Sequence, residues 1–256
     1  MLVLVPGAGS DRLRVFMIVM GLVLFSTMAL ASPYMQNVIG YPIITAGLLL
    51  ASRGFGTFFA MMMVGRIMRY IEARTLIISG LTLTAASLFQ MTGWTDLTQV
   101  PEIVTVSVIQ GFGFGLVFVP LSTVAFLTLS NELRTDGTAM LTLMRNVASS
   151  VGISVVIAEL TQGTRRTYAT LSEYINPFNH ALQMPSVSGM IDLSTDAGRA
   201  MADRMVSVQA QIIAFAHDYQ LVMFFILCTI PLALLIGSTK ATLRKQAAGP
   251  EHAVME

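Results

Sequence analysis

Six long apolar stretches separated by more polar segments dominate the sequence. A helix needs about 20 predominantly apolar residues to cross a bilayer core of roughly 30 Å, and each stretch is close to or above that length. The pattern therefore predicts an all-α integral membrane protein, folded as a bundle of six transmembrane helices. The predicted spans cover residues 15–38, 43–66, 75–92, 102–129, 138–161 and 219–238.

The composition supports this class. Hydrophobic residues make up 54% of the chain and charged residues 11%, whereas soluble domains carry about 25% charged residues. A net charge of +1 leaves no basic surplus for nucleic acid, so the lipid bilayer is the expected partner and nucleic acid is excluded. The single cysteine, the scattered histidines and the lack of a carboxylate or Ser–His pair in the spans predict neither an enzyme nor a cofactor or metal.

The basic residues predict how the helices are oriented. When the N-terminus is placed in the cytoplasm, the inner segments carry nine Lys and Arg residues and the two short outer connections carry none. Cytoplasmic loops are enriched in Lys and Arg, so both the N-terminal segment (1–14) and the tail (239–256) are expected to be cytoplasmic. We therefore expect a multi-pass protein of the cell (inner) membrane.

The connection from 162 to 218, which follows the five spans within 15–161, is long and is expected on the outer side. Pro177, Pro185 and Gly189 indicate a loop in its first part. From about Thr195 an amphipathic helical period begins, which either lies on the outer membrane surface or over a pocket, or leads directly into the last span at 219–238. Its predicted apolar face comprises Met201, Met205, Val208, Ile212 and Phe215, opposite Arg204, Ser207, Gln211 and Asp218.

The second span contains an arginine, Arg53, about ten residues from its start and thus near the midplane. A charge at that depth is costly and marks either a transport pathway or a static brace bonded to backbone carbonyls. Ala46, Thr57 and Ala60 share the helix face of Arg53, so this face is expected to look into protein or water. The bulky side chains of Phe55, Phe58 and Met62 point elsewhere.

The fifth span is the most polar. Arg145, Ser149, Gly152 and Glu159 fall on one stripe of the helix, which therefore cannot face lipid. Arg145 and Glu159 are about 21 Å apart along the axis, so each needs a partner on another helix. We expect Arg145 to line a cavity or an interface. Glu159 is either a proton-coupling carboxylate or a group that reaches interfacial water.

The fourth span combines small residues with a proline, Pro120, and an amide side chain. Ser107, Gly111, Gly115 and Ser122 lie on one side, and such a stripe permits close approach of a neighbouring helix. Gln110 adds a hydrogen-bonding amide at membrane depth.

Three runs of sequence resemble a known family: PYMQNVIGYPIITAGLLLASRGFGTFFAMMMVGRIMRYIEARTLI (33–77), IQGFGFGLVFVPLSTVAF (109–126) and RTDGTAMLTLMRNVASSVGISVV (134–156). Together they look like the C-terminal six-helix half of major facilitator transporters, and in particular of the fourteen-helix drug:proton antiporters of the Emr type.

The cytoplasmic loop GRIMRYIEART is similar to the family's G-x-x-x-D-x-x-G-R-R/K loop. Gly65 takes the leading glycine position, Arg66 follows it, and Arg74 takes the last basic position. Arg69 stands where the family has an acidic residue and Glu72 where it has the second glycine, so the loop departs from the family pattern.

The resemblance implies that the first, second, fourth and fifth helices line a central cavity and that a matching N-terminal half supplies the other side. It implies export of lipophilic or cationic small molecules in exchange for protons, by a chain that is incomplete on its own. The alternative is a non-transporting membrane remnant or accessory subunit that binds a partner through its helix faces. The expected cavity residues are Tyr34, Gln36, Asn37, Arg53, Gln110, Arg145 and Asn146, with Glu159 as the candidate for proton coupling.

Overall fold

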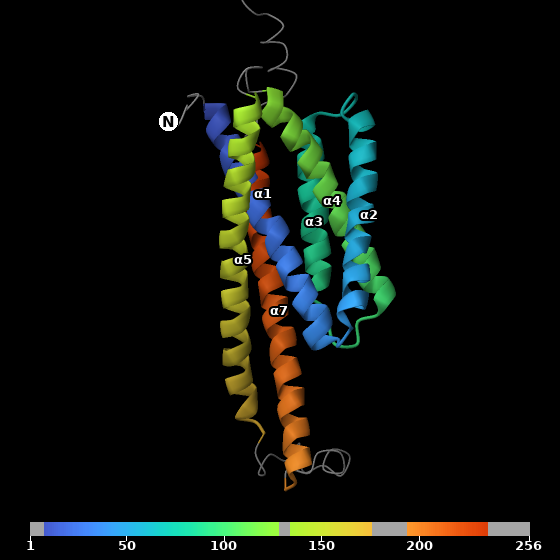
Figure 1. Cartoon of the computed structure of the whole chain (residues 1–256), viewed down its shortest axis with the longest axis vertical. Helices are drawn as coiled ribbons and strands as arrows, with labels where there is room; N and C mark the ends of the chain where they lie inside the picture. Colours follow the sequence, from blue (N-terminus) through green and yellow to red (C-terminus); the bar gives the residue numbers. More distant parts are fainter. Residues whose placement is uncertain (1–7, 128–133, 176–193, 235–256) are drawn as a thin grey trace, which may run out of the picture.

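The computed structural model of the chain describes residues 8–127, 134–175 and 194–234, and the regular elements in these ranges are helices. In chain order they are α1 (Ala8–Pro33), the π-helix η1 (Tyr34–Val38), α2 (Ile43–Ile67), α3 (Ala73–Met91), α4 (Val100–Leu127), α5 (Arg134–Ser172) and α7 (Asp196–Leu234) (Figure 1). The predicted all-α bundle of six long helices is confirmed.

Five of these helices are long and apolar enough to cross a membrane: α1 together with η1, α2, α4, α5 and α7. The remaining helix, α3, has 19 residues and carries several hydroxyl side chains. It nevertheless lies alongside the others, packed between α4 and α7 (Figure 1).

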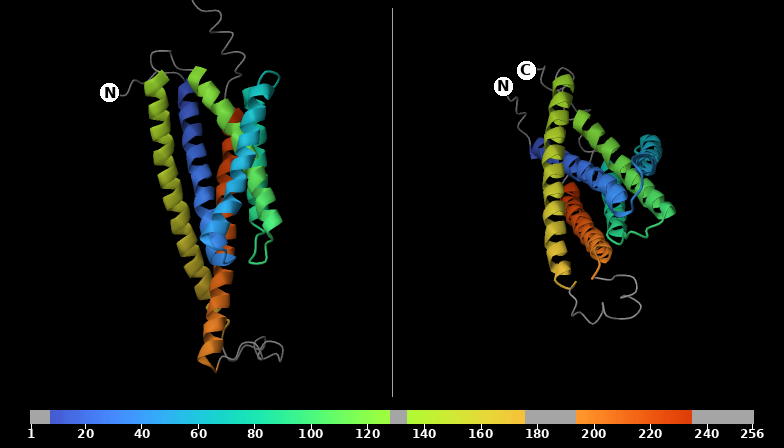
Figure 2. Two further views of the ribbon diagram at one scale, coloured as in Figure 1. Left: turned by 45° about the vertical axis from the view of Figure 1, so that its right-hand side comes forward. Right: turned by 60° about the horizontal axis from the view of Figure 1, so that its bottom comes forward.

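The bundle consists of two groups of three helices. In one group α5 packs on both α1 and α7, and in the other α4 packs on both α2 and α3. Contact between α3 and α7 joins the two groups, and the two further views show the same division (Figure 2).

Successive helices run in opposite directions. The start of α1 and the end of α7 therefore lie at the same end of the bundle, which is also the end that holds the turn between α2 and α3 (Figure 1). The opposite end holds the connections from η1 to α2 and from α3 to α4. This alternation is what the predicted orientation requires; which end is cytoplasmic stays a prediction.

The tightest helix contact is between α2 and α4, where the backbones touch. A Cβ atom added at Gly111 would lie 2.0 Å from the carbonyl oxygen of Arg53, and one added at Gly56 would lie 2.1 Å from that of Val108. Thr57 Oγ1 lies 3.0 Å from the carbonyl oxygens of both Arg53 and Gly111, so its hydroxyl joins the two helices. The close approach predicted from the small-residue stripe of the fourth span is confirmed.

Four buried aromatic rings join the two groups near η1. The ring of Tyr34 lies 5.4 Å from that of Trp94 and 5.3 Å from that of Phe215, and the Trp94 and Tyr219 rings are 6.2 Å apart. Tyr34 also donates a hydrogen bond to the carbonyl oxygen of Thr95, at 2.9 Å. Aromatic pairs of this kind contribute about 0.5–1.5 kcal/mol each beyond their buried area.

Two helices extend well past this aromatic cluster. α5 runs to Ser172, eleven residues beyond the predicted end of the fifth span, and α7 is one continuous helix from Asp196 to Leu234. Near Gly163 the helices are close, since a Cβ atom there would lie 3.5 Å from Cβ of Ala214. Residues 164–172 and 196–213 thus form a helical hairpin whose longer arm projects about 27 Å past Ala214 (Figure 1).

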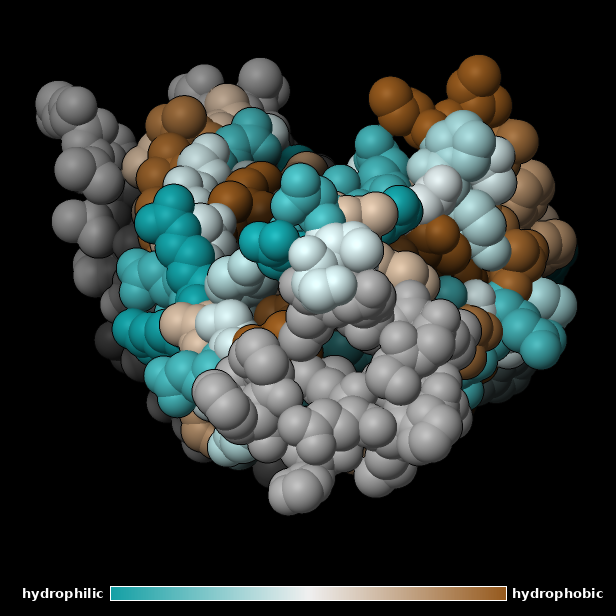
Figure 3. All heavy atoms as spheres, turned by 90° about the horizontal axis from the view of Figure 1, so that it is seen from below, coloured by the Kyte–Doolittle hydropathy of each residue, from teal (hydrophilic) through white to brown (hydrophobic). Residues whose placement is uncertain are grey.

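The hairpin settles the two interpretations of the amphipathic segment after Thr195. It is not a separate helix lying on a surface but the first half of α7, leading directly into the last span. Tyr168 of α5 donates a hydrogen bond to Asp203 of α7 and ties the two arms together. Seen from the hairpin end, many hydrophilic residues face the viewer (Figure 3).

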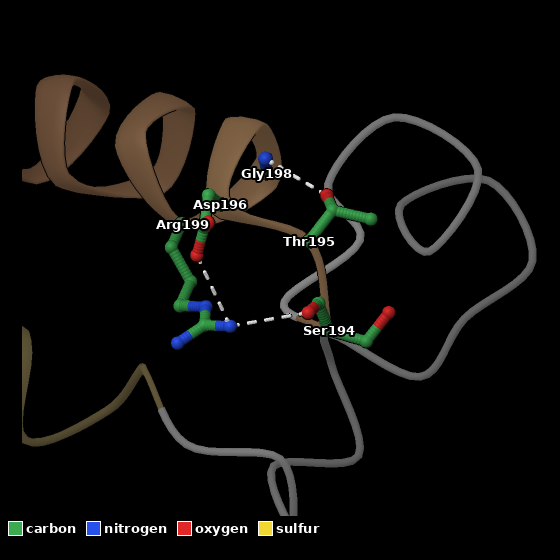
Figure 4. Close-up of polar contacts among 5 residues, drawn as sticks. All are labelled: Ser194, Thr195, Asp196, Gly198 and Arg199. Carbon is green, nitrogen blue, oxygen red and sulfur yellow. Dashed lines mark hydrogen bonds and ion pairs between the residues drawn. The ribbon is translucent and has the colours of Figure 1, made fainter.

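The start of α7 is fixed by a hydrogen-bonded cap. The backbone N–H of Gly198 donates to Thr195 Oγ1 at 3.1 Å, which is the arrangement of an N-cap residue (Figure 4). Arg199 lies 3.4 Å from the Asp196 carboxylate and donates to the carbonyl oxygen of Ser194 at 3.1 Å. Asp196 in the first turn also places a negative charge at the positive end of the helix dipole.

The predicted apolar face of this first half of α7 is wrong at its start and correct at its end, where Phe215 is buried. Met201 and Met205 are about half exposed, and Asp218, placed on the polar face, is 1% exposed. The buried positions are smaller residues, because short side chains let α7 approach α5 closely. They are Ala202, Val206, Ala210 and Ala214.

Candidate functional site

Arg53 lies inside the bundle, with 8% of its surface exposed. Its Nη2 donates a hydrogen bond to Oγ1 of Thr27 on α1, at 3.0 Å, and Thr27 in turn donates to the carbonyl oxygen of Leu24 at 2.8 Å. Arg53 therefore links α2 to α1. Among the described residues no carboxylate forms an ion pair with it.

The helix face that carries Arg53 is the one the sequence predicted. Ala46 and Ala60 are buried with it, whereas Phe55 and Phe58 are 66% and 63% exposed. The small-residue face thus packs against α4, and the bulky side chains point outward.

Arg145 lies where α5 crosses α1. A Cβ atom added at Gly21 of α1 would lie 2.7 Å from the carbonyl oxygen of Arg145, so only a glycine fits there. The guanidinium carbon lies 5.8 Å from the centre of the Phe118 ring on α4, which is the distance of a cation–π contact. The Nε atom of Arg145 is buried and has no hydrogen-bond partner among the described residues.

The predicted stripe of α5 divides between two environments. Ser149 and Gly152 are buried, and Gly152 packs against Leu22 and Ser26 of α1. Glu159 is exposed on the surface of α5. The middle of the stripe is therefore a helix contact, as expected for a face that avoids lipid, and its far end is open.

Two amide residues from the predicted cavity form hydrogen bonds with residues other than the two arginines. Gln110 is 2% exposed, and its Nε2 contacts Sδ of Met91 on α3 at 3.9 Å, on the side of α4 that faces away from α2. The side chain of Asn146 is exposed, and its backbone carbonyl oxygen accepts hydrogen bonds from the hydroxyl groups of Ser149 and Ser150.

Three of the predicted cavity residues occupy η1. Tyr34 is buried in the aromatic cluster, where it holds helices together. Gln36 donates to Oγ of Ser32 at 2.8 Å, and Asn37 is exposed. The wide turn of η1 follows Pro33, whose ring nitrogen cannot donate a helix hydrogen bond.

The residues of the predicted loop motif lie at the end of α2, in the turn that follows it and at the start of α3. Gly65, Arg66 and Arg69 are exposed and Arg74 is partly exposed. A Cβ atom at Gly65 would meet nothing within 4 Å in the described part of the chain. This glycine is therefore not required by any contact that the structure describes.

Three residues of the site were not identified from the sequence: Thr27, Phe118 and Asp218. Thr27 contacts Arg53, and Phe118 contacts Arg145. Both lie in predominantly apolar spans, where the sequence pattern does not single them out. The adjacent Ser26 and Thr27 were an available signal, because two hydroxyl residues in a row are unusual inside an otherwise apolar span. Asp218 is buried in α7, and its Oδ2 has no hydrogen-bond partner in the described ranges.

The chemistry of this arrangement is that of binding. Arg145 offers an N–H donor that has no partner in the described part of the chain and lies next to an aromatic ring, and Arg53 offers a buried charge held by a neutral hydroxyl. A few polar anchors in apolar surroundings are typical of sites for small lipophilic molecules.

Comparison with known proteins is consistent with a transporter. The family profile described as Major Facilitator Superfamily matches residues 7–161, more than half of the chain. The chain is 27% identical over 181 residues to the uncharacterized MFS-type transporter YhcA of Bacillus subtilis, covering 69% of this chain and 34% of that protein. It is 26% identical over 156 residues to the lincomycin resistance protein LmrB of Listeria monocytogenes, covering 61% and 33%.

It is also 26% identical over 160 residues to the multidrug export protein EmrB of Escherichia coli, covering 60% of this chain and 30% of that one. The chain thus spans about a third of the length of these curated relatives. Among solved structures, it resembles a bacterial homologue of the human lysosomal transporter Spinster, in an inward-facing and unoccupied conformation. The TM-score is 0.58 at 16% identity, and the match covers 88% of this chain and 48% of that one.

Proposed function

The chain belongs to the Major Facilitator Superfamily, a family of multi-pass membrane transporters rather than enzymes, and we propose that it forms the C-terminal half of a proton-coupled multidrug exporter. LmrB and EmrB, whose names refer to drug resistance and drug export, support this substrate class. Because the chain spans about a third of their length, the activity requires a matching N-terminal half around a shared site.

The surroundings of Arg145 are the observation that best supports the proposal. A guanidinium next to an aromatic ring, with one buried N–H left without a partner among the described residues, is costly unless something else completes it. A lipophilic molecule with an acceptor group would bind the N–H and stack on Phe118. We infer that Arg145 and Phe118 form the substrate contact of this half, with Arg53 as the second charge at membrane depth.

The charge of the site also bears on substrate choice. Arg53 and Arg145 are both cations without a carboxylate partner in the described ranges. This half therefore favours neutral or acceptor-bearing lipophilic compounds, and a cationic drug requires carboxylates contributed by the other half.

The first test compares the chain alone with the chain paired to a matching N-terminal half. Each is expressed in the inner membrane of a drug-hypersensitive bacterial host, and drug resistance and substrate-induced proton movement are measured. We expect neither activity from the chain alone and both from the pair. A pair that assembles in the membrane but gives no resistance to any of a broad set of drugs would instead favour the accessory-subunit alternative.

The second test separates binding from folding at Arg145. Arg145→Gln is expected to abolish transport by the paired protein while its membrane abundance is unchanged, and Arg145→Lys is expected to fail because it lacks the planar fork. Arg69→Gln is the matched control, since Arg69 is exposed in the loop and its loss should change little. Normal transport by Arg145→Gln at normal abundance would remove Arg145 from the site.

A further inference from the structure

Asp218 is a buried acid that the proposed substrate contact does not use. It lies on α7 beside the aromatic cluster, one residue before Tyr219, and 1% of its surface is exposed. Its Oδ2 atom is buried and has no hydrogen-bond partner among the residues that the structure describes. A buried polar atom of this kind is rare in folded proteins and calls for a specific explanation.

The charged and titratable groups around Asp218 do not neutralise a negative charge. From α5, Glu159 acts on it with a second negative charge. From η1, α2 and α7 come Tyr34, Arg53 and Tyr219, but Arg53 acts on Tyr219 and bonds Thr27 rather than Asp218. On α7 itself His217 is exposed, and the described part of α3 has Arg74 at its far end.

An ionised carboxylate at Asp218 would have no hydration and would be repelled by the negative charge of Glu159. Burying a charge without a partner is energetically costly, and the nearby carboxylate adds to that cost. A proton on Asp218 removes the buried charge and the repulsion at once. The packing of α7 on α5 seen here is thus the packing that a protonated Asp218 permits.

We propose that Asp218 is a proton-binding residue, loaded from the water side through the exposed Glu159. A proton from hydronium binds the Glu159 carboxylate, passes to the Asp218 carboxylate and leaves Asp218 as a neutral acid. Glu159 returns to its ionised form. No bond other than these O–H bonds forms or breaks, and no co-reactant is consumed.

Loss of that proton would act on the helix contact around Asp218. An ionised Asp218 needs water, and separation of α7 from α5 at the base of the helical hairpin, where Gly163 and Ala214 are in contact, would admit it. Proton release is therefore coupled to loosening of this contact. This coupling role rests on the proton-coupled function proposed above, whereas proton binding is a property of the chain on its own.

Infrared spectroscopy of the purified full chain in lipid nanodiscs tests the proposal without any substrate. Exposed carboxyl groups are ionised near neutral pH, so a C=O band of a protonated carboxylic acid there reports a buried acid. We expect this band in the unaltered chain, its loss in Asp218→Asn, and a shifted band in Asp218→Glu. Asp203→Asn, which alters an exposed acid of the same helix, should retain it.

Glu159→Gln addresses the loading step. The band should remain, but its shift on transfer into deuterated water should become several-fold slower, because the exposed relay is gone. A band that is absent in the unaltered chain, or one that persists in Asp218→Asn, would overturn proton binding at Asp218. An unchanged exchange rate in Glu159→Gln would overturn the relay. Because the measurement needs no transport, a negative drug-resistance result leaves its outcome unaffected.

Discussion

The contact between α2 and α4 allows a sharp test of the fold at Gly111. Substitution by Ala would place a methyl group 2.0 Å from the carbonyl oxygen of Arg53 and 2.9 Å from its carbonyl carbon. Ordinary contacts begin at 3.4 Å, so the helices would have to separate by about 1.4 Å. Backbone atoms cannot rotate away as a side chain does, and the hydrogen bonding of Thr57 across the contact would also be strained.

We expect Gly111→Ala to lower the free energy of unfolding by about 3 kcal/mol, the upper end of the usual range for overpacking. Gly54→Ala is the matched control, because a Cβ atom at Gly54 of α2 meets nothing within 4 Å. Replacing a helical glycine by alanine in open space stabilises a helix by up to about 1 kcal/mol. Thermal unfolding of the purified chain, followed by circular dichroism, should therefore move in opposite directions for the two variants. Equal melting of Gly111→Ala and the unaltered chain would refute the backbone contact.

Two further predictions concern the first helix and the orientation. Thr27→Val removes the acceptor for Arg53 and leaves a buried donor unpaired, so it should lower the free energy of unfolding by about 1–3 kcal/mol. Thr27→Ser keeps the hydroxyl and should retain most of the thermal stability. Equal melting temperatures of the two variants would contradict the hydrogen bond. Reporter fusions at Lys240 and near Asp136 should report the cytoplasm, and one near Ser188 the outer side, as the distribution of basic residues predicts. A reporter at Lys240 found outside would contradict the six-span arrangement.

The helix ends inside the bundle could be predicted from hydropathy. The predicted span 43–66 corresponds to α2 at Ile43–Ile67, and the predicted span 75–92 to α3 at Ala73–Met91. A membrane helix must satisfy its backbone hydrogen bonds internally and carry apolar side chains over its whole length. The apolar run and the helix therefore end at nearly the same residues.

Side-chain direction could be predicted only where one face differs clearly from the rest. Arg53 shares its face with alanines and a threonine, and α2 buries that face. On α4, by contrast, α2 packs on one side and α3 on another, so burial alone does not distinguish them. Gln110 contacts α3 because of where α2 and α3 lie around α4. The sequence of α4 alone does not reveal that arrangement.

The helical hairpin and Asp218 were missed for a related reason. Outside an apolar span, a helix is stabilised by the partner it packs on, and α7 packs on α5 through alanines that carry little hydrophobic signal. The larger Met201 and Met205 dominate the pattern but remain half exposed. Asp218 looks like a polar-face residue by periodicity, because its burial depends on helices more than fifty residues away in sequence.

The two intramembrane arginines are linked through α1, although neither belongs to it. Arg53 donates to Thr27, and the backbone of Arg145 packs directly on Gly21, about 9 Å away along the same helix. Six residues correspond to a rotation of about 240° around the helix axis, so α2 and α5 hold α1 from different sides. A shift of α1 relative to either neighbour changes the contacts of both arginines. The substrate contact proposed at Arg145 would therefore act on the helix that also anchors Arg53, so that binding in one helix group would reach the other.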